Sequence, residues 1–192
     1  MTALTLQLPS NLQFTDEEFA QIVAVNKELR LELTAEGELI IMSPTGGETG
    51  NRNFELYLDL GVWNRQNKLG KAFDSSTGFK LPNGATRSPD ASWIRIERWD
   101  ALTPEQRKKF LPLCPDFAVE LVSETDDVED TKAKMEEYLA NGLQLGWLIN
   151  PKDKQVIIYR PNLAPKVLQS PTSLSGEDVL PGFVLNLQQI FA

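Results

Sequence analysis

The chain has 192 residues with 41% hydrophobic and 24% charged residues, which predicts a single domain, residues 1–192, with a sizeable core. It contains no histidine and one cysteine, Cys114, so histidine triads, histidine-ligated zinc and thiolate zinc sites within one chain are excluded. A metal would have to be held by oxygens, which favours Mg²⁺ or Mn²⁺.

The composition also predicts where the protein acts. No apolar stretch reaches the ~18 residues of a membrane span, and the N-terminus lacks the basic start and long apolar core of a signal peptide. A lone cysteine fits a reducing compartment, so we expect a cytoplasmic protein without membrane contact.

The net charge of −8 counts against a broad basic surface for nucleic acid, although it leaves room for a local basic cleft.

The N-terminal third predicts a helix, a hairpin and a long helix. Thr15 followed by Glu18 is a capping-box pattern that predicts a helix start. Residues 29–33 and 38–42 alternate around Ala35-Glu36-Gly37, which is typical of a β-hairpin.

Residues 48–67 form the longest helical pattern. We expect its apolar side to be marked by Asn51, Phe54, Leu58, Leu56, Leu60 and Trp63. Its polar side chains recur at steps of three or four and share one face: Glu48, Arg52, Glu55 and Asp59.

The remaining chain alternates strands with helices. A helix is expected to start at 103–106, where proline takes the first position, and another to cover 123–141, with acidic residues in its first turns. The expected strands are 71–73, 77–81, 90–96, 117–122, 145–150, 155–160, 166–168 and 184–187. The pattern predicts an α+β (α/β-like) fold in which a mixed β-sheet is flanked by helices.

Asp90 and Glu120 each lie in a short apolar strand-like run. A carboxylate buried in such a run costs several kcal/mol without a partner, so a divalent cation between the two is the candidate explanation. The carbonyl of Leu121 would be free to act as a third ligand, because Glu120 and Leu121 project from opposite faces of their strand. Two simpler interpretations remain: Asp90 as a turn or strand cap, and Glu120 as a solvent-facing residue of a half-buried sheet.

The two acids resemble the signature of the PD-(D/E)XK nuclease superfamily, with Pro89-Asp90 as the first half and Glu120-Leu121-Val122 as the second. More closely, the chain resembles the Uma-two family of restriction-endonuclease-like proteins. The matching segments run from about Leu29 to the end: 37–44, 87–90, 119–123, Lys134 to Tyr138, 146–151 and 180–183. The resemblance implies a restriction-endonuclease-like fold and a Mg²⁺- or Mn²⁺-dependent endonuclease, with nucleic acid as substrate and DNA favoured.

One position departs from the superfamily. A lysine usually follows the second acid by two residues, where this chain has Val122. The resemblance suggests a lysine that has moved to the next helix, and Lys134 matches the family position four residues before Tyr138. Lys132 is the other option. Glu48 and Glu55 on the long helix would assist a second metal or the attacking water.

Three functions therefore compete. The leading hypothesis is a metal-dependent nuclease that acts as a homodimer, for which apolar residues 156–159 offer a strand edge. The second is a catalytically inactive nuclease-like fold that serves as a binding or regulatory module, favoured by Val122 and by the net negative charge. The third is a phosphoesterase acting on a small nucleotide, which a closed pocket would favour over an open groove.

Overall fold

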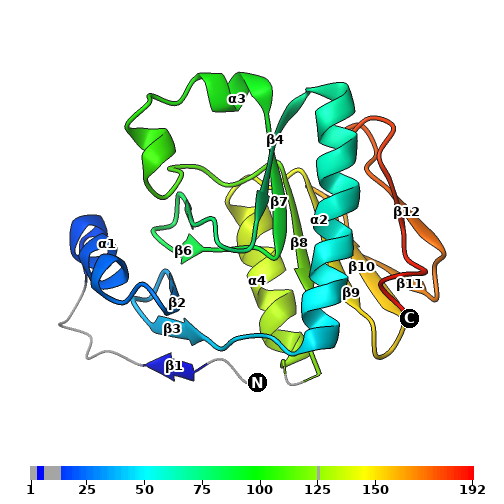
Figure 1. Ribbon diagram of the computed structural model, residues 1–192, viewed down its shortest axis with the longest axis horizontal. Helices are drawn as coiled ribbons and strands as arrows, with labels where there is room; N and C mark the ends of the chain where they lie inside the picture. Colours follow the sequence, from blue (N-terminus) through cyan, green and yellow to red (C-terminus); the bar gives the residue numbers. More distant parts are fainter. Residues whose placement is uncertain (1–3, 7–13, 125) are drawn as a thin grey trace.

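The computed structural model describes residues 4–6, 14–124 and 126–192, and it contains two main sheets (Figure 1). The smaller lies beside helix α1 (Asp16–Val25), and the larger lies between two longer helices. The α+β architecture with a mixed sheet is as the sequence predicts. No helix of the described residues is long and apolar enough to cross a membrane.

The first sheet is built around the predicted hairpin. Its strand order is β1 (Leu4–Leu6), β3 (Leu39–Met42), β2 (Arg30–Leu33), β6 (Thr86–Arg87) and β5 (Phe79–Lys80). The capping box that the sequence predicts opens α1, since Thr15 accepts a hydrogen bond from the backbone N–H of Glu18. Apolar residues of β2 and β3 pack against Phe19 of α1, and the opposite face of β2 therefore points toward the rest of the molecule.

The second sheet has six strands, in the order β11 (Lys166–Gln169), β10 (Gln155–Tyr159), β9 (Leu145–Asn150), β8 (Phe117–Leu121), β7 (Ala91–Arg95) and β4 (Gly70–Asp74). Only the central pair β8–β9 is parallel. Helix α4 (Val128–Ala140) connects these two strands, as a parallel crossover requires. All five residues of β8 are buried, so both faces of this strand are covered.

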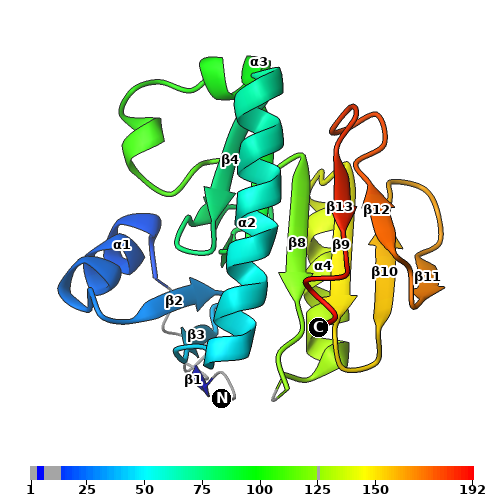
Figure 2. The same ribbon diagram turned by 45° about the vertical axis from the view of Figure 1, so that its right-hand side comes forward.

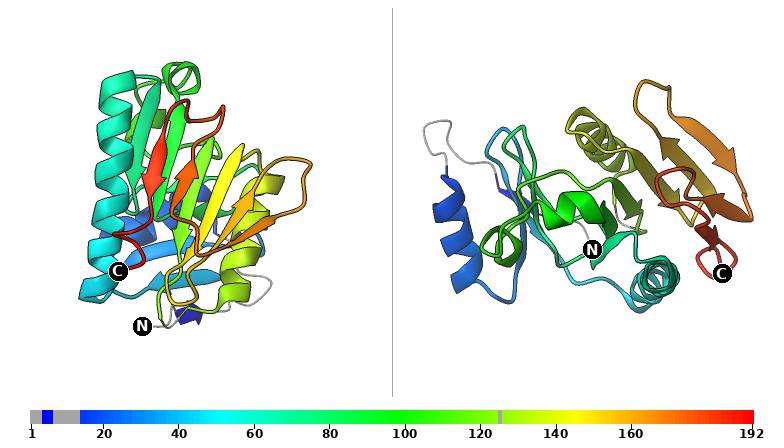
Figure 3. Two further views of the ribbon diagram at one scale, coloured as in Figure 1. Left: turned by 90° about the vertical axis from the view of Figure 1, so that its right-hand side faces the viewer. Right: turned by 90° about the horizontal axis from the view of Figure 1, so that it is seen from above.

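Two helices cover opposite faces of this sheet (Figures 2 and 3). Helix α2 (Gly47–Asn67) packs Leu56, Leu60 and Trp63 on one face, where the β-hairpin of β12 (Ser173–Ser175) and β13 (Val184–Asn186) also contributes to the core. Helix α4 packs Met135 and Tyr138 on the other. The odd-numbered residues of β8 face α2 and its even-numbered residues face α4, so Glu120 points to the α4 side.

Several element boundaries differ from the sequence predictions. Helix α4 starts at Val128 with Asp127 as its N-cap, so the acidic residues before it form a loop, in which Thr125 lies outside the described residues. The helix expected from residue 103 is a single 3-10 turn, Gln106–Lys108. Helix α3 (Ile96–Asp100) directly follows β7 and was not predicted, because a five-residue helix carries too little periodicity to recognise.

The expected dimer edge is also wrong. Strand β10 is hydrogen-bonded on both sides, to β9 and to β11, and residues 156–159 are buried.

The predicted apolar side of α2 also needs a correction. Leu56, Leu60 and Trp63 are buried, as expected for an apolar side. Phe54 and Leu58, which the sequence placed on the same side, are exposed on the outer surface of the helix.

Candidate functional site

The strand register brings Asp90 and Glu120 together. Strands β7 and β8 pair antiparallel with Ala91 opposite Val119, so continuing the register by one residue places Asp90 opposite Glu120. Directly opposed residues of an antiparallel pair have Cβ atoms about 4.5–5.5 Å apart. Asp90 also shares its face of the sheet with Ile94, which packs on the α4 side as Glu120 does.

Asp90 ends the pairing of β7 with β8. Its Oδ2 accepts a hydrogen bond from the backbone N–H of Leu121 at 2.8 Å, in the place where the strand would otherwise continue the ladder. The N–H and C=O of one strand residue point toward the same edge, so the carbonyl of Leu121 also faces the end of β7. Asp90 thus caps a strand end, but through the backbone of β8 and not through its own backbone as the simpler interpretation expects, and its other carboxylate oxygen is left for a second role.

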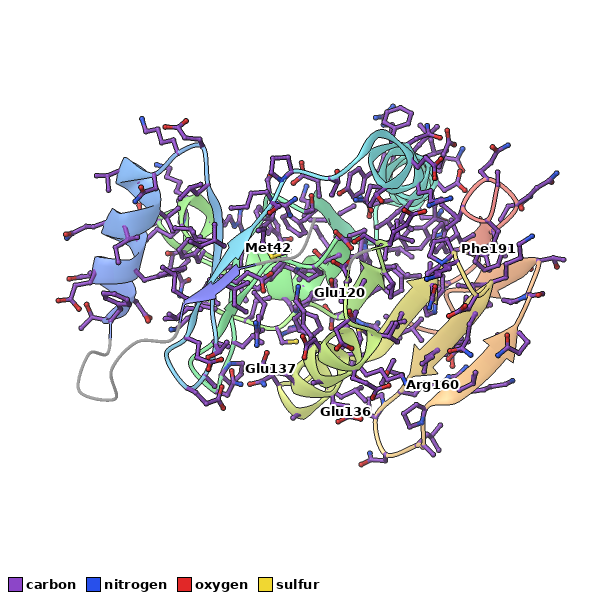
Figure 4. All side chains as sticks on the ribbon, turned by 90° about the horizontal axis from the view of Figure 1, so that it is seen from below. Met42, Glu120, Glu136, Glu137, Arg160 and Phe191 are labelled. Carbon is purple, nitrogen blue, oxygen red and sulfur yellow. The ribbon has the colours of Figure 1, made fainter. Side chains whose placement is uncertain are left out.

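Glu120 is held by two residues of α4. Its Oε1 accepts a hydrogen bond from the hydroxyl of Tyr138 at 3.0 Å and pairs with Nζ of Lys134 at 3.0 Å. Only 6% of the residue is exposed, so it is not a solvent-facing residue of a half-buried sheet. Figure 4 shows Glu120 near the middle of the molecule, between the N-terminal sheet and α4.

A third acid, Glu32 of β2, belongs to the same group. Its Oε1 pairs with Nζ of Lys134 at 3.0 Å and accepts the N–H of Ser88 at 2.9 Å, and its Oε2 lies 3.3 Å from Nη1 of Arg87. The Nε of Arg87 donates in turn to Oε2 of Glu137 on α4 at 2.5 Å.

Sequence reasoning missed Glu32, Arg87 and Glu137. Leu31-Glu32-Leu33 alternates as a half-exposed strand does. Its middle residue is buried through tertiary contacts with Lys134 of α4 and with Arg87 and Ser88. The hydroxyl of Tyr138, which the resemblance used only as a landmark, was missed as a partner of Glu120 for the same reason.

Burial and charge pull the carboxyl pKa values in opposite directions. Burial raises the pKa of Glu120 to about 7, against the opposing charge of Lys134, and burial also raises the pKa of Asp90. Burial acts on Glu32 too, but the charges of Lys134 and Arg87 lower its pKa below the ordinary value. The neighbouring carboxylates raise the pKa of Lys134 in spite of its burial, so its ammonium is charged at neutral pH.

These residues line a cleft of about 880 Å³ between the two sheets and α4. Glu48 lines it as well, whereas Glu55 does not. Lys132 also stays outside and pairs with Glu129 on the surface of α4 at 2.7 Å. The structure thus brings Asp90, Glu120, Leu121, Lys134 and Glu48 to one cleft and leaves Glu55 and Lys132 out of it.

The donor set fits a divalent cation held by two carboxylates and a carbonyl. Among the described residues, donors occupy Oδ2 of Asp90 and Oε1 of Glu120. No described donor bonds to Oδ1 of Asp90 or to Oε2 of Glu120. Within the same part of the chain, no group of three or more acidic, cysteine or histidine side chains could hold a metal by itself. Mg²⁺ commonly uses one or two carboxylates and completes its shell with waters and substrate phosphates, which agrees with this set.

Known proteins resemble this chain in sequence and in fold. The model of the Uma2 family, described as "Putative restriction endonuclease", matches residues 16–188. A crystal structure described as a putative nuclease belonging to DUF820 from Anabaena variabilis ATCC 29413 superposes with a TM-score of 0.77 at 20% sequence identity. The superposition covers 93% of this chain and 97% of that one. No curated protein matches the chain significantly.

Proposed function

This chain belongs to the Uma2 family of restriction-endonuclease-like proteins, and from that premise we propose that it is a metal-dependent endonuclease. Its reaction would be hydrolysis of phosphodiester bonds in nucleic acid, with DNA as the favoured substrate and Mg²⁺ or Mn²⁺ as the cofactor. The observation that supports this most is the convergence of Asp90, Glu120 and Lys134 at one cleft. An α+β fold by itself would not distinguish a nuclease from many other proteins.

Asp90, Glu120 and the carbonyl of Leu121 are the proposed metal ligands. A divalent cation bound there would polarise a phosphate oxygen and lower the pKa of a water molecule. The hydrogen bond from Leu121 fixes the orientation of the Asp90 carboxylate, and the hydroxyl of Tyr138 fixes that of Glu120. Each acid thereby presents one defined oxygen at the cleft.

Lys134 is the proposed source of positive charge at the scissile phosphate. It reaches the site from α4 and takes over the function of the lysine that Val122 replaces on the strand. Its ammonium is fixed beside Glu120, where it would stabilise the negative charge that develops as water attacks phosphorus. Glu48, at the start of α2 on the cleft wall, remains a candidate for orienting that water.

The experiment that tests this function is titration calorimetry with Mn²⁺, combined with cleavage of single- and double-stranded DNA and of RNA. We expect saturable binding and metal-dependent cleavage in the wild type, and loss of both in Asp90→Ala and Glu120→Ala. Glu36→Ala is the matched control, because Glu36 is an exposed acid on the wall of the same cleft. Metal-dependent cleavage that survives in both variants would contradict the assigned roles.

One observation favours the second candidate function, a non-catalytic binding module. Eleven acidic side chains line the cleft, against four basic ones (Arg30, Arg52, Arg87 and Lys134), and such a wall repels a nucleic acid backbone. Wild-type protein that binds Mn²⁺ weakly or not at all and cleaves none of the three substrates would support this candidate.

We further propose that the protein forms a homodimer through α2. Phe54, Leu58 and Val62 follow one another at steps of four residues on its outer surface and are 58%, 45% and 42% exposed. The helix carries Glu55 in its first half and Arg65 in its second half. A two-fold axis near Leu58 and Val62 would align two copies antiparallel, so that each apolar row meets the other and Glu55 faces Arg65 of the second copy.

A further inference from the structure

Helix α4 supplies the site with a lysine from outside the strand that carries Glu120. A lysine side chain has four rotatable bonds and no intrinsic preference for one direction. A lysine on β8 would be held by the rigid sheet, but a lysine on α4 must be directed by contacts. The contacts of its Nζ atom therefore decide where its charge lies.

Two carboxylates hold this ammonium. Nζ of Lys134 lies 3.0 Å from Oε1 of Glu120 and 3.0 Å from Oε1 of Glu32. An ammonium group has three N–H donors in tetrahedral directions, so two fixed acceptors determine the direction of the third. No other described residue accepts a hydrogen bond from Nζ, and Lys134 lines the cleft.

Glu32 is itself immobilised. The N–H of Ser88 and the guanidinium of Arg87 hold its two oxygens, and both residues belong to the segment that leads directly to Asp90. Only 2% of Glu32 is exposed. The side chain therefore connects three parts of the site: the hairpin from which it comes, the segment that ends in Asp90, and the lysine of α4.

We propose that Glu32 is a positioning residue that holds the ammonium of Lys134 beside Glu120 and directs its third N–H into the cleft, toward a substrate phosphate. The proposal rests on the function proposed above. Without Glu32, Lys134 would pair with Glu120 alone and could rotate about that single contact. The Uma2 resemblance and the acid pair do not assign this role, since Glu32 lies on the first sheet, about 90 residues before Glu120 in the chain.

The first test follows the lysine directly. In protein labelled with nitrogen-15 lysine, a buried and doubly bonded ammonium exchanges slowly enough to give a proton–nitrogen signal, which Lys134→Arg identifies by its loss. We expect Glu32→Gln to shift or broaden this signal, while Glu36→Gln, which removes the same charge from the exposed tip of the hairpin, leaves it unchanged. An unchanged signal in Glu32→Gln overturns the proposal, whether or not the protein cleaves nucleic acid.

The second test follows the reaction. Residues that orient a catalytic group typically contribute about 10- to 100-fold, so Glu32→Gln should lower kcat by that factor and leave KM nearly unchanged. A lost signal with an unchanged kcat in an active wild type would show a structural role only and overturn the proposal. If the wild type cleaves nothing, the proposed function fails, and the signal alone decides whether Glu32 holds Lys134.

Melting temperatures of all variants separate misfolding from mispositioning. If Glu32→Gln does not fold, Glu32→Asp replaces it, because it keeps the charge and withdraws the carboxylate by one methylene. We expect the same change of the Lys134 signal in Glu32→Asp, and an unchanged signal would again overturn the proposal.

Discussion

At Glu120, burial and the neighbouring charge of Lys134 act on the carboxyl group in opposite directions. Water is nearly excluded from its side chain, which raises its pKa to about 7, while Lys134 stabilises the ionised form. The carboxyl group of the metal-free protein therefore takes up a proton at a higher pH than an ordinary glutamate does. A divalent cation binds only the ionised form, so it competes with the proton for this residue.

This competition predicts the pH dependence of metal binding. Because the pKa of Glu120 is raised to about 7, Mn²⁺ affinity should be level above that pH and fall by up to about tenfold for each unit below it. Titration calorimetry at pH 5.5, 6.5 and 8 measures the effect. An affinity that stays constant between pH 5.5 and 8 would show that a proton on Glu120 does not compete with the metal in this range.

The two simpler interpretations of the acids were resolved differently. Asp90 caps the strand end through the N–H of Leu121 on the neighbouring strand and not through its own backbone, and this bond uses only one of its two oxygens. Glu120 has no exposed face, since α4 covers it. The choice between Lys132 and Lys134 as partner of Glu120 was open in the sequence because both flank the apolar side of the helix, and the packing of α4 on the sheet brings Lys134 alone to Glu120.

At the scale of elements, the contact between α4 and β9 sets the position of Lys134. Met135, the next residue, packs over Gly146 of β9, where an added Cβ atom would lie 2.3 Å from Cε of Met135 and 2.8 Å from Cδ2 of Leu143. The absence of a side chain at residue 146 therefore lets the helix approach the sheet closely. A Cβ atom there would first have to displace the ends of these two side chains, which fill the space between α4 and the sheet.

Gly146→Ala tests this contact. Overpacking of a well-filled core costs about 1–3 kcal/mol, and the new Cβ first meets the flexible ends of Met135 and Leu143, so the variant should lose unfolding free energy at the lower end of that range. Gly61→Ala is the control, because no atom lies within 4 Å of its added Cβ and an alanine inside a helix should stabilise by about 0.5–1 kcal/mol. Urea unfolding curves measure both. Equal effects of the two substitutions would contradict the role of the α4–β9 contact.

At the scale of the whole molecule, charge and symmetry determine how a substrate could bind. The acidic cleft wall matches the net charge of −8, so long-range attraction of nucleic acid cannot be the source of affinity. Bound divalent cations and a second copy of the chain would both change the net charge that a nucleic acid meets at the cleft. The α2 surface is where the described part of the molecule presents a regular apolar row to solvent.

Charge reversal tests the α2 dimer. We expect Leu58→Asp to give a monomer in analytical ultracentrifugation, since it places a charge in the apolar row. Glu55→Arg and Arg65→Glu should each weaken the dimer, and the double variant should restore it, because the two charges then exchange places. A monomeric wild type at high protein concentration, or a double variant weaker than either single one, would exclude this interface.

The sequence by itself determined most of the main elements and the kind of ligand that a metal could have. The capping box, the hairpin of β2 and β3 and the long helix follow from local patterns that the structure confirms. The lack of histidine limits any metal to oxygen ligands. Only the tertiary structure decided which charges meet. Glu32 of β2, Arg87 of β6, and the α4 residues Lys134 and Glu137 come from three distant parts of the chain. No local periodicity records a contact that exists only once two sheets and a helix pack together.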